Sequence, residues 1–158
     1  PRTSLLAGLR LESFQGLELE FTPRASAVVE VVPDVLALRG AWGQAYKAPD
    51  LRQQFQENPF IRANPDIEPE RSESWEGGAD VTLAAGRVSL GLTYFDQDFE
   101  NLIRNILPEG EDRSVNMNIG ASEARGLEWS VRARPRDGLR LGFTGSWIDT
   151  AILDNEGL

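Results

Sequence analysis

The sequence predicts an all-β fold: an antiparallel, up-and-down transmembrane β-barrel, of which these 158 residues would supply about seven strands. Three observations lead to this prediction. Apolar and polar residues alternate one by one over long segments. The connections between those segments are alternately short and long. Aromatic residues recur on the apolar face, at similar distances from the short connections.

The alternation identifies the strands. Successive side chains of a strand point to opposite sides, so a period of two separates an apolar face from a polar one. Between residues 88 and 95, Val88, Leu90, Leu92 and Tyr94 share one face and smaller or polar residues share the other, apart from Phe95. The predicted strands are Thr3–Glu12, Arg24–Val32, Val35–Tyr46, Glu70–Ala84, Arg87–Arg104, Asn118–Arg134 and Leu139–Thr150.

The connections indicate the orientation of these strands. Tight turns follow Val32, Ala84 and Arg134, whereas longer connections cover residues 13–23, 47–69 and 106–117. Short turns at one end and long loops at the other are typical of outer-membrane barrels, in which the long loops face outside. The strand ends at 95–104 and 118–125 are expected to extend beyond the bilayer as a hairpin.

An aromatic girdle is predicted at one height of the wall. Its members, Trp42, Trp75, Tyr94 and Trp147, lie about 8 to 10 residues from a tight turn, which corresponds to roughly 20 to 25 Å along a tilted strand. The opposite face would line a watery lumen with the charged residues Glu30, Arg39, Asp80, Glu128, Arg132 and Arg140. A soluble antiparallel sandwich also alternates, but its aromatic residues would scatter in height.

Composition excludes several classes of protein. The net charge of −9 disfavours a nucleic-acid partner, and no apolar run has the roughly 18 residues of a spanning helix. The absence of cysteine and histidine rules out disulfides, thiolate chemistry and histidine triads within this stretch. No nucleophile-elbow, zinc-protease or P-loop pattern occurs, so we expect neither an enzyme nor a cofactor.

A metal site is also not expected. Asp96, Asp98 and Glu100 share one face, and their oxygens would suit calcium or magnesium. The glycine turn and ligand spacing of a known calcium loop are missing, so exposed acidic strand ends are the preferred interpretation.

The order of several motifs resembles the TonB-dependent outer-membrane receptors. A Lys-Ala-Pro run precedes an Asn-Pro-x-x-x-Pro-Glu run and a Trp-Glu-Gly-Gly run, and an Asn-x-Gly…Gly-x-Glu strand follows. Nearly the whole chain is covered, with matching order and spacing. The motif residues are Lys47, Ala48, Pro49, Asn64, Pro65, Pro69, Glu70, Glu76, Gly77, Gly126 and Glu128.

These motif residues are interpreted as architectural. Pro49 fixes φ and lacks an N–H donor, so it ends the strand, and Pro65 and Pro69 stiffen the return path. The inward carboxylates of Glu76 and Glu128 are expected to pair with lumen arginines such as Arg39 or Arg132.

The resemblance implies a function and a location. Such receptors have about 22 strands and an N-terminal plug, and they import ferric siderophores, cobalamin or similar scarce solutes. Residues 1–158 would be part of the barrel, with the plug and the C-terminal strands absent. Expected partners are outer-membrane lipid and lipopolysaccharide of a Gram-negative bacterium, a small-molecule ligand, and TonB through a plug segment outside this chain. The alternatives are a passive porin or adhesin barrel, and a soluble β-sheet binding domain.

One long connection offers candidate ligand-binding residues. It combines cations, amides and an aromatic ring, which together suit an anionic, hydrogen-bonding ligand such as a ferric siderophore. An ordinary solvated loop is the alternative for each of them. The candidates are Lys47, Arg52, Gln56, Asn58, Phe60 and Arg62.

Overall fold

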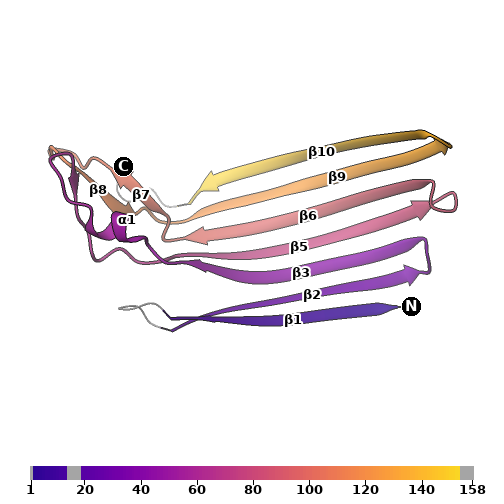
Figure 1. Ribbon diagram of the computed structural model, residues 1–158, viewed down its shortest axis with the longest axis horizontal. Helices are drawn as coiled ribbons and strands as arrows, with labels where there is room; N and C mark the ends of the chain where they lie inside the picture. The colour runs from indigo at the N-terminus through magenta and orange to yellow at the C-terminus, as the bar shows by residue number, and fades with distance from the viewer. Residues whose placement is uncertain (1, 14–18, 154–158) are drawn as a thin grey trace.

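The computed structural model describes residues 2–13 and 19–153, which form one long antiparallel sheet and a smaller group of elements at its end. In the sheet, seven strands follow the order β1-β2-β3-β5-β6-β9-β10, so each pairs with its neighbours along the chain (Figure 1). Their bounds are Thr3–Glu12 (β1), Glu20–Val32 (β2), Leu36–Lys47 (β3), Glu70–Leu83 (β5), Val88–Glu100 (β6), Ser122–Arg136 (β9) and Leu139–Ile152 (β10). We call this sheet the wall.

The wall confirms the predicted fold class, as an open section of an up-and-down barrel. Strand β1 has the predicted bounds, and most other strand ends lie within two residues of the predicted ones. Strand β2 begins at Glu20, ahead of the predicted start at Arg24. Between β3 and β5 the pairing runs without interruption from Leu36 opposite Val81 to Lys47 opposite Glu70. Each wall strand therefore presents the alternating faces that the sequence indicates.

The short connections are tight turns with residues in the left-handed region. Asp34 has φ 58°, and Val35 donates its N–H to the carbonyl of Val32 at 3.0 Å. Ala84 and Ala85 have φ values of 51° and 55°, although a Cβ disfavours this conformation. Turns of this hand match the right-handed twist of the two strands that they connect.

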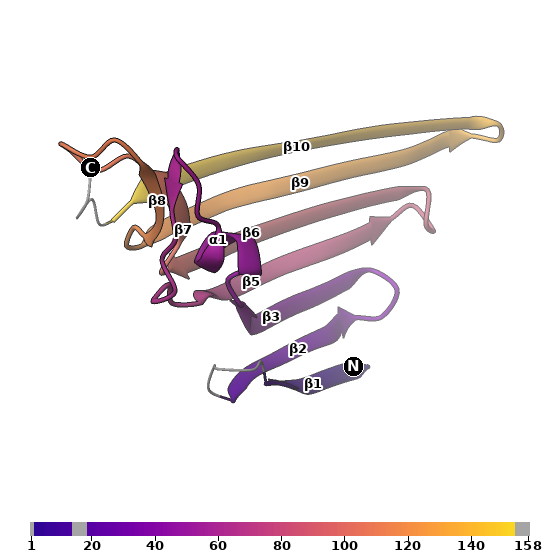
Figure 2. The same cartoon turned by 60° about the vertical axis from the view of Figure 1, so that its left-hand side comes forward.

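At the other end of the wall, two segments expected to be loops are folded. They contain α1 (Leu51–Phe55) and a three-stranded sheet in the order β4-β8-β7, made of Ile61–Arg62, Ser114–Asn118 and Ile103–Ile106. We call residues 48–69 and 101–119 the loop lobe. Figures 1 and 2 both place it at the end of the sheet opposite the tight turns.

Two predicted strands are shorter at the loop lobe than the sequence predicted. Arg87–Arg104 was expected to run on as one strand, but β6 ends at Glu100 and the chain turns at Asn101, which has φ 56°. Similarly, the predicted Asn118–Arg134 is interrupted near Gly120, which has φ 87°. Positive φ breaks the strand conformation at both points. The hairpin beyond β6 and β9 therefore forms a separate small sheet and does not extend the wall.

The buried apolar side chains lie in the loop lobe. Ile67, Ile103 and Val115 are only 3%, 7% and 2% exposed, and within the described ranges they are the buried hydrophobic residues. The wall has no second layer, so Leu92 and Phe143 remain exposed at 47% and 63%. The α-helix among the residues described is too short to cross a membrane.

Candidate functional site

On the polar face of the wall, Arg39 bridges three strands. Its Nε donates to Asp80 Oδ2 at 3.0 Å, and its Nη2 donates to Thr93 Oγ1 at 2.6 Å. Gly78 lies between them, where a Cβ would come within 3.0 Å of the Arg39 Cζ and 2.7 Å of the Leu92 carbonyl oxygen. The missing side chain therefore lets the guanidinium lie flat across β5.

The ion-pair partner of Arg39 is not the one expected from the sequence. Glu76 and Glu128 were expected to pair with arginines such as Arg39 or Arg132, but Arg39 pairs with Asp80. Neither glutamate forms an ion pair with any residue in the described parts of the chain. The strand register places Arg39 opposite Gly78, with Glu76 and Asp80 each two residues away along β5, and the guanidinium of Arg39 bonds Asp80.

On the apolar face, the register sets the positions of the four predicted girdle residues. Trp42 and Trp75 are direct neighbours on β3 and β5, with ring centroids 5.7 Å apart and ring planes tilted by 43°. Tyr94 and Trp147 flank Leu127 on either side. The four aromatic residues thus lie as two groups along the wall, and their contact with lipid remains a prediction.

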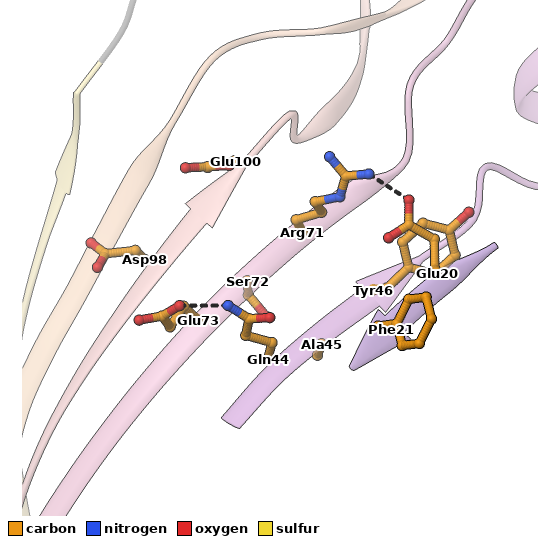
Figure 3. A pocket seen from close by; sticks show the side chains of 10 residues that line it. All are labelled: Glu20, Phe21, Gln44, Ala45, Tyr46, Arg71, Ser72, Glu73, Asp98 and Glu100. Carbon is orange, nitrogen blue, oxygen red and sulfur yellow. Dashed lines mark hydrogen bonds and ion pairs between the residues drawn. The ribbon is translucent and has the colours of Figure 1, made fainter. Parts of the chain in front are cut away.

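A polar rim lies between the tryptophan pair and the loop lobe. Glu73 accepts hydrogen bonds from Trp75 Nε1 at 3.1 Å and from Gln44 Nε2 at 2.8 Å. Beside it, Arg71 on β5 pairs with Glu20 on β2 and spans the intervening β3, as Figure 3 shows. No cluster of metal-binding side chains occurs in the residues that the structure describes. The apolar face therefore ends abruptly in charged, mutually paired groups.

Two motif residues attach the loop lobe to the wall. Lys47, at the end of β3, donates to Glu70 Oε2 at 2.6 Å, directly across the strand pair. The other oxygen of Glu70 accepts the backbone N–H of Ile103 at 2.9 Å. Glu70 therefore links β3 and β5 with the start of β7, which gives the Lys47 and Glu70 motif positions a structural role.

Asparagines hold the two segments of the loop lobe together. Asn64 Nδ2 donates to the Asn116 carbonyl, and Asn116 Nδ2 donates to the Gln53 carbonyl, both at 2.9 Å. The Asn118 amide both accepts from the Glu68 N–H and donates to the Glu68 carbonyl, again at 2.9 Å. A side-chain amide can replace a peptide group in this way because it carries the same donor and acceptor.

Hydrogen bonds within its first turn stabilise helix α1. Asp50 accepts a hydrogen bond from the Gln53 N–H at 2.7 Å, and the Gln53 side chain accepts from the Asp50 N–H at 2.9 Å, which completes a capping box. Pro49 is buried immediately before it. The short helix therefore has a defined orientation at the entry to the loop lobe.

The six candidate ligand residues fall into three groups. Three have structural partners: Lys47 pairs with Glu70, Asn58 Oδ1 accepts from the N–H groups of Phe60 and Ile61, and Arg62 pairs with Glu111 at 3.5 Å. Gln56 ends α1 and is half-buried. Arg52 and Phe60 remain exposed, and Phe60 is 78% exposed. None of these placements tests ligand binding.

The structure adds two residues that the sequence analysis missed. Leu51 and Phe55 are 75% and 58% exposed and, with Arg52, line an open groove between α1 and the Pro65–Pro69 segment. Their spacing of four residues puts them on one face of the helix. The spacing of Leu51 and Phe55 is visible in the sequence, but a five-residue helix is too short to be recognised by its periodicity.

One carboxylate of the loop lobe has a shifted pKa. Glu57 accepts the Ala63 N–H at 2.7 Å and also pairs with Arg113. The backbone hydrogen bond, followed by that from Arg113, lowers the pKa of Glu57 below its usual range. Glu57 therefore stays ionised at neutral pH and connects the two segments of the lobe.

Comparisons with known proteins agree with this architecture. Residues 1–157 match the sequence model of the family described as TonB dependent receptor-like, beta-barrel. The receptor SusC of Bacteroides thetaiotaomicron is 28% identical over 75 residues, which cover 46% of this chain and 8% of SusC.

Two solved structures illustrate the similarity in fold. The siderophore receptor PirA from Pseudomonas aeruginosa superposes with a TM-score of 0.82 at 23% identity, covering 95% of this chain and 29% of PirA. A mutant of the ferric enterobactin receptor PfeA from Pseudomonas aeruginosa, in complex with enterobactin, gives 0.79 at 22% identity, covering 94% and 25%.

Proposed function

We propose a function from one premise: the chain belongs to the TonB-dependent receptor β-barrel family, whose model matches residues 1–157. The chain spans 29% of the length of PirA, so the activity of the whole receptor extends beyond the residues described here. The proposed contribution of this chain is a section of the barrel wall and the loop lobe that lies on it.

The receptor takes up a scarce solute by TonB-dependent active transport. The observation that supports this most is the family match over nearly the entire chain. A ferric siderophore is the preferred solute, because the similar folds include siderophore receptors, and cobalamin is the alternative. The chain is assigned no catalytic role. Energy coupling would use TonB and a plug segment outside residues 1–158.

The two faces of the wall support an outer-membrane location. The face that carries Leu90, Leu92 and Tyr94 meets lipid, and the face that carries Arg39 and Asp80 meets the lumen. Trp42, Trp75, Tyr94 and Trp147 mark the boundary with lipopolysaccharide. The loop lobe then lies on the extracellular side of a Gram-negative outer membrane, at the end opposite the tight turns.

The ligand contacts are assigned to the exposed members of the candidate set. Arg52 supplies a cation that is not in an ion pair with any described residue, and Phe60 supplies an exposed aromatic ring. A ferric siderophore complex that is anionic and partly apolar could bind both. Lys47, Asn58 and Arg62 would contribute mainly by holding the loop lobe in place, because their side chains already have partners.

Uptake in cells tests this proposal. The intact receptor would be produced in a bacterium that lacks its own siderophore receptors, and the accumulation of radiolabelled ferric siderophores and cobalamin would be measured with and without TonB. We expect accumulation of at least one solute only when TonB is present. Equal accumulation without TonB would establish the passive barrel instead, and no accumulation of any solute would contradict the proposed transport.

Two variants test the ligand contacts in the same assay. Arg52→Ala and Phe60→Ala should each weaken the uptake of the identified solute, by about tenfold where a charge-assisted contact is lost. Arg136→Ala, at the tight-turn end of β9, is the matched control and should leave uptake unchanged. Normal uptake in both loop variants would show that the ligand binds elsewhere.

A further inference from the structure

The two segments of the loop lobe, residues 48–69 and 101–119, share main-chain hydrogen bonds although they are far apart in sequence. Strand β4 pairs in parallel with β8, with Ile61 opposite Ser114 and Arg62 opposite Val115. The Ser114 N–H also donates to the Phe60 carbonyl at 2.9 Å. A single sheet therefore contains backbone from both segments.

Side chains extend this connection along the length of the loop lobe. Asn116 and Asn118 in the second segment bond the backbone at Gln53 and Glu68 in the first. Asn118 additionally donates to the Asn101 carbonyl at 2.7 Å, and Asn101 Nδ2 donates to Glu68 Oε2 at 3.0 Å. Asn118 thus contacts both segments through one amide group.

The loop lobe also buries apolar side chains from both segments. Ile67 comes from the first segment, and Ile103 and Val115 come from the second, and all three are more than nine-tenths buried. The pairing of Ile103 with Asn118 and of Ile106 with Val115 places Ile103 and Val115 on opposite faces of the small sheet. The lobe therefore buries apolar side chains from both segments and on both faces of the sheet that the segments share.

We infer that the two long loops form one rigid body and that Asn118 is the residue that locks them together. Asn101 and Gly120, with φ values of 56° and 87°, are the points at which the second segment leaves the wall. The inference rests on intramolecular contacts and holds for any transported solute.

Hydrogen–deuterium exchange on the intact receptor tests this coupling. Asn118→Ala should raise exchange by about tenfold in both segments, because the amide bonds each of them. Leu107→Ala is the matched control: its side chain in the second segment is 63% exposed, so exchange should change in neither segment. Faster exchange confined to residues 114–119 in Asn118→Ala would overturn the inference.

A second measurement does not depend on a destabilised variant. Spin labels would be attached to Phe60→Cys and Leu107→Cys, one in each segment, since both residues are highly exposed and the chain has no cysteine of its own. We expect one narrow distance distribution from pulsed electron paramagnetic resonance. A broad or multiple distribution would show that the loops move separately. Either result is independent of uptake, so failure of the transport proposal would remain distinguishable.

Discussion

The wall and the loop lobe are stabilised in different ways, although their segments alternate along the same chain. The wall satisfies its backbone through regular pairing of neighbouring strands but leaves both faces open. The loop lobe has little regular pairing, yet it buries Ile67, Ile103 and Val115 and uses asparagine side chains in place of backbone. The wall therefore leaves its apolar side chains exposed, whereas the loop lobe buries apolar side chains of its own.

A charge on the apolar face of the wall, which we propose meets lipid, should have the largest effect on stability. Leu90 lies in an apolar row between Val81 and Val131. Leu90→Arg should destabilise the intact receptor by about 2–4 kcal/mol, the cost of a cation near the bilayer midplane. Urea titration after folding into lipid vesicles would measure it. Thr144→Arg, on the polar face, is the control and should cost much less; equal losses would mean that the faces are assigned wrongly.

Truncation of a buried side chain of the loop lobe should affect the lobe and spare the wall. Ile67→Ala is expected to cost about 2–4 kcal/mol locally, because it leaves a cavity among packed side chains. Hydrogen exchange should therefore accelerate in residues 48–69 and 101–119 while wall amides keep their protection. Leu107→Ala removes a side chain that is 63% exposed and should change neither region. Accelerated exchange throughout the wall would show that the two regions unfold together.

Close packing within the wall can be tested at two glycines. A Cβ at Gly126 would lie 2.5 Å from the Trp147 carbonyl oxygen and 2.6 Å from the Phe95 Cζ, whereas a Cβ at Gly77 would meet nothing within 4 Å. Gly126→Ala should therefore cost about 1–3 kcal/mol through overpacking. Gly77→Ala should cost nothing, and a similar loss in both variants by urea titration would contradict the observed contacts.

Relieving the strained turn at Ala84 and Ala85 should give a small gain in stability. Ala84 and Ala85 both have positive φ, for which Asn and Gly are better suited. Replacing them with Ala84→Asn and Ala85→Gly should stabilise the receptor by about 1 kcal/mol. Ala79→Gly, in the interior of β5, should destabilise it by about 0.5–1 kcal/mol. A loss of stability in the turn variant would rule out relief of strain.

The smallest expected effect is a pH dependence confined to the loop lobe. Because folding lowers the pKa of Glu57, its contribution is complete above the unfolded value of about 4.3 and disappears as pH falls through the lower folded value. Corrected exchange of residues 58–63 should therefore rise on acidification in the native protein. It should be insensitive to pH in Glu57→Gln, whereas Glu109→Gln should behave like the native protein.

The sequence by itself determined the wall. Alternation such as Leu90, Leu92 and Tyr94 against Ser89 and Thr93 identifies strands and faces locally, because the period of two is a property of each segment alone. The tight turns then determine which strands are neighbours, and the motif order around Pro49 and Glu70 identifies the family.

Only the tertiary structure decided how the long loops fold and which candidate residues are available. The pairing of Asn118 with Glu68, and of Arg39 with Asp80 across Gly78, joins residues far apart in sequence, and no local pattern specifies such partners. For the same reason, the sequence does not distinguish Lys47 and Arg62 from Arg52. The structure does, because it places Glu70 beside Lys47 and Glu111 beside Arg62. Periodicity reports the local environment of a segment, whereas hydrogen bonds between distant segments depend on how the whole chain packs.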